Sequence, residues 1–226
     1  MKLAIFSAPE YYEGEEKLVE TFLGAGLEYF HLRKPGWEET QFHKYLKKIH
    51  PIFYRKIILH GGFGLIKKYN LKGIHLNGEA IKMRKLEELK YIMKGARIRG
   101  LKISSSAHCF EELEQYGKNF SHLFLSPVFD SISKKGYKTG FNLNEIKEKL
   151  DKRREERSAT EIWGLGGINS ENLPKVFQAG FTGAAVLGTI WNRYTSGGAD
   201  MAFDEFENLK QAYSLSKEND RETFTS

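Results

Sequence analysis

Short apolar runs alternate with longer amphipathic segments from one end of the chain to the other. Eight runs have the length and composition of buried strands, and they cover residues 3–6, 27–33, 56–60, 72–76, 101–105, 122–127, 161–166 and 183–188. Segments of helical period lie between and after them, at 15–26, 38–51, 62–70, 83–95, 109–118, 142–150, 171–180 and 200–213. Several of these helices are expected to end at Gly26, Gly95 and Gly180, because glycine adopts the left-handed C-terminal cap without strain.

This order of elements predicts the fold class. Eight strand-then-helix units in about 210 residues favour a closed parallel (β/α)8 TIM barrel of the α/β class over a doubly wound sheet. No linker-like change in composition divides the chain, so we expect residues 1–213 to form one domain. The polar segment SLSKENDRETFTS, residues 214–226, is expected to be a disordered tail.

Composition narrows the classes of function. The apolar runs are far shorter than the ~18 residues that cross a bilayer, and the N-terminal run is too short for a secretory signal, so we expect a cytoplasmic protein. A single cysteine, Cys109, excludes an intrachain disulfide and a multi-cysteine zinc site. The net charge of +6 comes from basic residues scattered among acidic ones. This distribution argues against nucleic-acid binding and is compatible with a small anionic substrate.

A barrel of this kind places its site at the C-terminal ends of the strands, so the polar residues that close each strand are candidates. Gly166 and Gly167 follow the seventh predicted strand, with Ser170 as the expected cap of the next helix. Leu187 and Gly188 stand at the end of the eighth strand. Glycines let backbone N–H groups approach an oxyanion, and a helix N-terminus adds partial positive charge. The two positions together predict a phosphate site.

Six stretches, in this order and spacing, resemble the thiamine phosphate synthase/TenI family. They are HLRK, KGIHLNGEA, SSSAHCFEEL, SPVFDSISKKG, GLGGINSENL and AGFTGAAVLGTI, and the resemblance covers about residues 2–192. It implies a barrel enzyme of thiamine biosynthesis. In the synthase branch a pyrimidine diphosphate is joined to a thiazole phosphate, and Mg²⁺ holds the departing pyrophosphate.

The resemblance also assigns roles to residues. After the sixth strand, Ser131 and Ser133 take the place of hydroxyls that hold the thiazole phosphate, and Lys134 that of the lysine that holds pyrophosphate. The other candidate substrate-binding positions are Arg33, Lys34, His60, Ser106, Gly166, Gly167, Leu187 and Gly188. An ordinary solvated loop is the alternative for residues 131–135.

The chain departs from the synthase pattern at the metal ligands. His60–Gly61 stands where synthases carry an Asn–Asp pair, and Ala80 where they carry another acid. Neither Gly61 nor Ala80 can offer the oxygen ligand that Mg²⁺ requires, and a relocated site would have to use Glu79. After the second strand, Lys34 precedes Pro35 where the family has an acid and then a lysine, so Lys34 is expected to reach the same anion.

These departures favour the TenI-like branch, whose members can act as thiazole tautomerases. His108 lies where that branch has its acid/base histidine, and imidazole can exchange protons near neutral pH without a metal. A helix cap is the alternative role for His108. The main prediction is therefore a metal-independent tautomerase without a cofactor. The alternatives are a Mg²⁺-dependent synthase and a non-catalytic binding protein. The expected partners are a phosphorylated thiazole, a pyrimidine diphosphate in the synthase case, and a second copy of the chain in a homodimer, with neither nucleic acid nor membrane.

Overall fold

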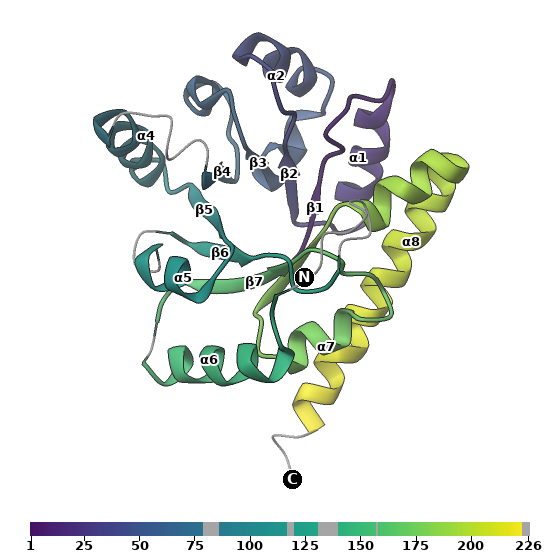
Figure 1. Cartoon of the computed structure of the whole chain (residues 1–226). Helices are drawn as coiled ribbons and strands as arrows, with labels where there is room; N and C mark the ends of the chain where they lie inside the picture. The colour runs from purple at the N-terminus through teal and green to yellow at the C-terminus, as the bar shows by residue number, and fades with distance from the viewer. Residues whose placement is uncertain (79–85, 117–119, 131–139, 157, 223–226) are drawn as a thin grey trace.

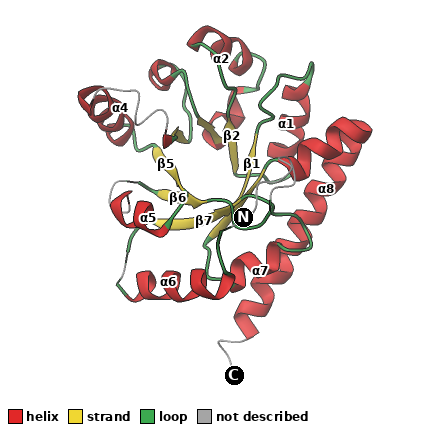
Figure 2. Cartoon of the chain, viewed as in Figure 1, coloured by secondary structure: helices red, strands yellow, loops and turns green. Residues whose placement is uncertain are grey.

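Eight parallel strands close into a barrel in the computed structural model, with the helices outside it (Figures 1 and 2). The structure describes residues 1–78, 86–116, 120–130, 140–156 and 158–222. Each strand pairs with the next one in the sequence, and β8 pairs with β1. The strands are β1 (Leu3–Phe6), β2 (Tyr29–Leu32), β3 (Ile57–Leu59), β4 (Gly73–Leu76), β5 (Lys102–Ala107), β6 (His122–Leu125), β7 (Glu161–Leu165) and β8 (Gly183–Val186). The predicted fold class is confirmed.

The outer layer consists of seven α-helices and two 3₁₀-helices in the part of the chain that the structure describes. They are α1 (Glu15–Gly24), α2 (Glu39–Leu46), η1 (Pro51–Lys56), η2 (Phe63–Lys67), α4 (Leu86–Ile98), α5 (Phe110–Tyr116), α6 (Leu143–Glu155), α7 (Leu173–Gln178) and α8 (Gly188–Glu222). Helix α8 contains one break, at Gly198, where φ is 81° and ψ is −164°. None of the described helices combines the length and apolar character that crossing a membrane requires.

Three local predictions differ from the structure. The segment 62–70 forms the short 3₁₀-helix η2 and not an α-helix, because Gly62 takes a left-handed conformation and the Gly64 N–H is held by the Glu39 carboxylate at 2.9 Å. Helix α4 runs through Gly95 and stops before Gly100, whose φ is 66°. Helix α8 continues to Glu222, through most of the predicted tail.

The apolar side chains divide into two groups. The larger one fills the space between the barrel and the helices, and it includes Phe22, Leu32 and Ile57. The smaller one lies inside the barrel and consists of Ala4, Phe6, Phe124, Trp163 and Ala185. Because side chains alternate along a strand, the same eight strands supply both groups.

Histidines complete the barrel interior. The ring of His31 stacks on Phe6 with centroids 4.6 Å apart and meets the edge of Phe124 at 5.2 Å. His75 lies 5.7 Å from Phe124, and His122 stacks on Trp163 at 4.8 Å. Rings from strands that are not neighbours approach this closely only inside the barrel. Much of its interior is therefore imidazole where aliphatic side chains are usual.

Candidate active site

Arg33 follows β2 at the C-terminal mouth of the barrel. The buried Ser7 hydroxyl fixes its backbone, accepting from the Arg33 N–H at 2.8 Å and donating to the Arg33 carbonyl at 2.7 Å. Within the described residues no carboxylate pairs with the Arg33 guanidinium. Arg33 is thus positioned by a rigid strand end and is available to an anion.

Lys34 has a different environment from the one the sequence predicts. Its ammonium lies 2.6 and 2.8 Å from the two oxygens of Glu15, and both side chains are completely buried. It also donates to the Glu10 carbonyl at 2.6 Å. Burial lowers the pKa of Lys34 and raises that of Glu15, while the mutual hydrogen bond opposes both shifts. The structure commits Lys34 to an internal ion pair, which opposes the expectation that it reaches a substrate anion.

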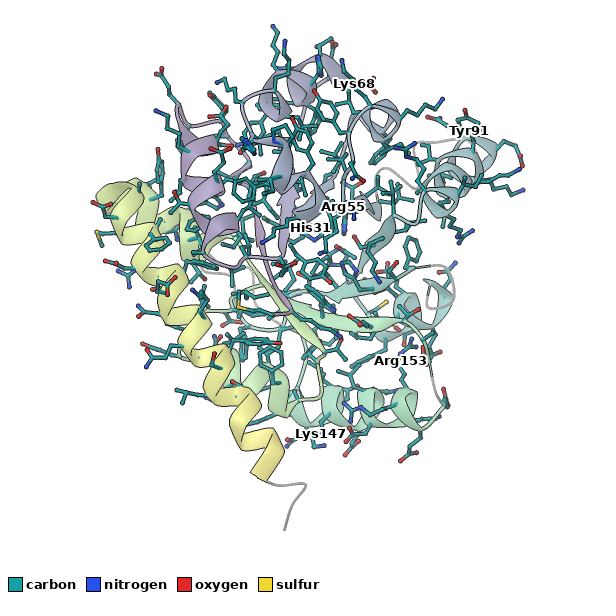
Figure 3. The ribbon with its side chains drawn as sticks, turned by 180° about the vertical axis from the view of Figure 1, so that it is seen from behind. His31, Arg55, Lys68, Tyr91, Lys147 and Arg153 are labelled. Carbon is teal, nitrogen blue, oxygen red and sulfur yellow. The ribbon has the colours of Figure 1, made fainter. Side chains whose placement is uncertain are left out.

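His60, directly after β3, joins the interior histidines to the mouth. One of its ring nitrogens, Nε2, lies 2.9 Å from Nδ1 of His31, and its ring stacks on His75 with centroids 4.1 Å apart. The His75 ring is held between two hydroxyls, with Nδ1 3.0 Å from Ser104 Oγ and Nε2 3.3 Å from Ser106 Oγ. Figure 3 shows His31 near the middle of the barrel. The candidate residues His60 and Ser106 therefore belong to one connected group.

The imidazoles of this group have a lowered pKa, which favours the neutral form. Burial is the main cause, and it lowers the pKa of His31 and His60 well below the ordinary value. The pKa of His75 falls to about 3, again mainly through burial, with smaller contributions from the charges of His122 and Arg33. Neutral imidazoles keep a nitrogen lone pair, so these rings can accept a hydrogen bond or bind a metal ion.

His108 closes β5 on the exposed surface of the mouth. Its Nδ1 lies 3.0 Å from the Ser126 carbonyl, and its backbone N–H donates to Glu112 at 2.7 Å. A carbonyl can only accept, so Nδ1 is the donor in this contact. The backbone of His108 thus takes part in the helix start, and the acid/base role of its ring stays a prediction.

The turn after β7 and the beginning of the loop after β6 form one unit. Gly166 and Gly167 have φ of 98° and 65°, and a Cβ on Gly167 would lie 2.2 Å from the Asp130 carbonyl oxygen. The backbone N–H groups of Val128 and Phe129 donate to Leu165 and Gly166 at 2.9 and 3.1 Å. The glycine pair is therefore required by close packing against residues 127–130, as well as being a candidate anion site.

Asn172 follows this turn and changes the predicted helix start. Its side chain donates to the Gly167 carbonyl at 2.9 Å and accepts from the Asn169 N–H at 2.9 Å. Helix α7 consequently begins at Leu173. The prediction that Ser170 caps this helix is wrong, because the Ser170 hydroxyl donates to Glu205 at 3.2 Å.

Helix α8 begins at Gly188, directly after β8. Its first turn is fixed by Trp191, whose indole N–H donates to the Phe6 carbonyl at 2.7 Å, and by the Thr189 hydroxyl, which donates to the Ile168 carbonyl. The N–H groups of a first helical turn have no acceptor within the helix. Leu187 and Gly188 thus lie at the fixed, positively polarised end of a helix.

The remaining predicted residues cannot be placed. Ser131, Ser133 and Lys134, and also Glu79, lie outside the described residues. The chain enters the first of these segments from Asp130 and the second from Gly78, both of which the structure describes.

Comparisons with known proteins agree with this barrel fold. A family model described as thiamine monophosphate synthase matches residues 4–190. The chain belongs to this family. The match covers most of the sequence, including β2 to β8 and all of β1 except Leu3.

Two curated relatives and one solved structure give the extent of the similarity. Thiamine-phosphate synthase of Flavobacterium johnsoniae is 22% identical over 84% of this chain and 88% of its own length. The enzyme of the same name from Flavobacterium psychrophilum is 26% identical over 59% of this chain, and the match spans 62% of the relative. The crystal structure of thiamine phosphate pyrophosphorylase from Bacteroides thetaiotaomicron superimposes with a TM-score of 0.75 at 26% identity, covering 95% of this chain and 98% of the other.

Two features of the site were not predicted. The convergence of His31 and His75 with His60 is one, although the alternation in YFHLR and GIHLN places His31 and His75 on the inward face of their strands. The buried partner of Lys34 is the other. Glu15 is 19 residues away and lies in a segment that reads as an ordinary helix start, so no local pattern announces the pair.

Proposed function

We propose that the protein joins a pyrimidine diphosphate to a thiazole phosphate, as a thiamine-phosphate synthase does. The observation that carries this proposal is the family match over residues 4–190, together with curated relatives named thiamine-phosphate synthase. This reaction was the alternative in the sequence analysis, and these relatives support it better than they support the tautomerase.

The mouth of the barrel offers this reaction two anion-binding elements. Arg33 presents a guanidinium without a carboxylate partner among the described residues, and such a group binds phosphate oxygens in a bidentate manner. The turn at Gly166–Gly167 and the first turn of α8 at Gly188 present backbone N–H groups from fixed positions. Separate elements suit a reaction in which one substrate carries a diphosphate and the other a phosphate.

The chain's own contribution to the chemistry is positioning and charge stabilisation. The new bond forms as pyrophosphate leaves, so negative charge accumulates on the departing group. A guanidinium held in advance by Ser7 stabilises that charge without reorganisation. Holding both substrates at one mouth lowers the entropic part of the barrier.

The Mg²⁺ that the family implies does not fit the donors at the ends of β3 and β4. Those described ends read His60–Gly61–Gly62 and Asn77–Gly78, and neither has a carboxylate. Mg²⁺ prefers oxygen ligands in an octahedral arrangement, whereas imidazole nitrogen suits later transition metals.

One observation favours a second candidate, the tautomerase. With Nδ1 donating to the Ser126 carbonyl, the neutral ring of His108 carries its lone pair on Nε2, which can act as a base at the mouth. Such a base can remove a proton from a thiazole carboxylate phosphate and return it elsewhere on the molecule.

A direct assay separates the two candidates. The purified protein is given both synthase substrates, and separately the thiazole carboxylate phosphate in deuterated solvent. The proposal expects thiamine phosphate from the first mixture and a rate that falls roughly 10²-fold or more in Arg33→Ala, since a transition-state charge contact is lost. Lys175→Ala on the outer helix α7 is the matched control and should keep the full rate.

The outcomes are distinct. Deuterium incorporation without thiamine phosphate formation supports the tautomerase, and its rate should then fall roughly 10²–10⁴-fold in His108→Asn. Thiamine phosphate formation that is unaffected by Arg33→Ala would reject the assigned anion site. Turnover of neither mixture would reject both reactions.

A further inference from the structure

Three imidazoles converge just below the barrel mouth, and the proposed reaction gives them no role. His31 from β2, His60 directly after β3 and His75 from β4 each offer one ring nitrogen, and these three nitrogens lie within 4.8 Å of one another. Three neighbouring, hydrogen-bonded strands carry the group. The separation of the rings is therefore set by the barrel and not by a flexible loop.

Two of the three rings have a buried nitrogen without a partner. Neither Nε2 of His31 nor Nδ1 of His60 has a hydrogen-bond partner in the described part of the chain, and both atoms are inaccessible to solvent. Buried polar atoms are nearly always satisfied in folded proteins, so orphaned ones point to a missing water, ion or ligand. These two atoms are not the nitrogens that face each other, His31 Nδ1 and His60 Nε2, so the orphans show a gap in the hydrogen bonding around both rings and do not themselves mark the position of an ion.

The contacts of His75 resemble those of a metal ligand with an outer support. Its Nδ1 lies 3.0 Å from Ser104 Oγ, and Nε2 makes the longer contact of 3.3 Å with Ser106 Oγ. Metal-bound imidazoles usually keep a hydrogen bond on the nitrogen that does not bind the metal, because it fixes the ring orientation. Ser104 provides this support, and Nε2 is the nitrogen that is easier to release.

The other two rings share a hydrogen bond that an ion can replace. His31 Nδ1 and His60 Nε2 are 2.9 Å apart, and two nitrogens bound to one tetrahedral Zn²⁺ at its usual bond length are separated by about 3.3 Å. His60 must also turn out of its stack on His75, because a nitrogen lone pair lies in the ring plane and these planes are only 17° from parallel. Gly61 and Gly62 follow His60, so no bulky side chain comes immediately after it.

We propose that His31, His60 and His75 bind one late first-row divalent metal ion of the Zn²⁺ class. Three imidazoles leave a fourth position open, as in zinc sites that bind water or a substrate oxygen. Arg33 follows β2 directly and lies two residues after His31, and its positive charge favours an anionic oxygen at the open position.

The inference goes beyond the proposed function, because metal binding is measured on the protein without substrates. The full chain is stripped with a chelator and titrated with Zn²⁺ by calorimetry, and with Co²⁺ by visible absorption. We expect one ion per chain with an affinity in the micromolar range or tighter, tetrahedral Co²⁺ bands, and no comparable response to Mg²⁺. His60→Ala should weaken Zn²⁺ binding roughly 100-fold or more, which is at least the effect of losing an outer support.

Two further variants make the result decisive. His108→Asn removes an exposed imidazole from the same mouth and should keep the wild-type Zn²⁺ affinity. His60→Gln is measured beside His60→Ala, with circular dichroism to confirm that each is folded. Equal Zn²⁺ affinities in the wild type and a folded His60 variant would overturn the proposal, and so would binding lost only in His108→Asn. An absence of stoichiometric binding to the wild type would overturn it as well.

Discussion

Substitutions in the buried ion pair of Lys34 and Glu15 can distinguish a structural role of Lys34 from a substrate-binding role. Lys34→Met removes the ammonium and keeps an unbranched apolar side chain. It leaves the Glu15 carboxylate without its cation in a position where both side chains are completely buried. Removing one partner of a buried ion pair typically costs about 3–5 kcal/mol, a large part of the total stability of about 5–15 kcal/mol for a domain.

The local contacts support the upper part of that range. Besides the two short distances to Glu15, the ammonium loses the Glu10 carbonyl at 2.6 Å and lies 5.7 Å from the ring centroids of both Tyr11 and Trp37. At an effective dielectric of about 20, the direct attraction between charges 3 Å apart is on the order of 5 kcal/mol. Few of these interactions remain in Lys34→Met.

Urea unfolding followed by tryptophan fluorescence measures the effect in four proteins. They are the wild type, Lys34→Met, Glu15→Gln and the double variant. Glu15→Gln keeps an oxygen for the Tyr12 N–H, which donates to Glu15 at 3.0 Å. We expect the double variant to be more stable than the sum of the single losses predicts, by about 2 kcal/mol or more, because it buries no unpaired charge.

The competing interpretation makes the opposite prediction. If Lys34 binds a substrate anion, the free energy of unfolding of Lys34→Met should lie within about 1 kcal/mol of the wild-type value, and the variant should lose affinity for inorganic pyrophosphate. That pattern would refute the structural role assigned here. A stability loss with little coupling to Glu15 would refute the ion pair as its cause.

Two further predictions concern the barrel itself. Burial lowers the pKa of His75 and His122 to about 3 in the folded protein. As the pH falls, these two histidines therefore become protonated in the unfolded chain before they do so in the folded one. In the presence of chelator, the free energy of unfolding should therefore be highest above about pH 6.5 and should fall towards pH 3 by up to ~1.4 kcal/mol per pH unit for each histidine. His122→Leu should make this dependence on pH less steep. Equal urea midpoints at pH 7 and 5 would contradict the prediction. Gly73→Ala places a Cβ 2.2 Å from the Lys102 carbonyl oxygen and should lower the free energy of unfolding by about 1–3 kcal/mol. Gly140→Ala, which has open space around the new Cβ, should leave it unchanged. Equal thermal midpoints for the two variants would contradict the close packing at Gly73.

The strands were predictable because each is a short apolar run between polar segments, and a single barrel accommodates eight of them. Helix ends were less predictable. Gly95 resembles a C-terminal cap, yet α4 continues three residues beyond it, since a glycine in a helix costs only about 1 kcal/mol and packing overrides it. The polar segment after 213 joins α8 because the preceding helix is already formed and extension adds a hydrogen bond for each residue.

A site residue could be placed from the sequence only where its position depends on the end of a single strand. The positions of Arg33, His108 and Gly188 follow from the strand-then-helix order alone. The environment of Lys34 and the convergence of His31, His60 and His75 depend on contacts between distant segments, which a single sequence does not encode in any local pattern. The same residue types at the same positions would have different chemistry if Glu15 were apolar.

The contact of Gly167 with the Asp130 carbonyl has a consequence for engineering and for evolution. The segment that carries Ser131, Ser133 and Lys134 leaves the barrel from a backbone that is hydrogen-bonded to the turn after β7. A loop transplanted from a relative should fold correctly only if the relative's glycine turn and its counterpart of Asn172 are transplanted with it, although they lie more than 30 residues later in the sequence. Residues 126–130 and 166–172 should thus be exchanged as a single cassette, and substitutions in one half should be accepted only with matching substitutions in the other.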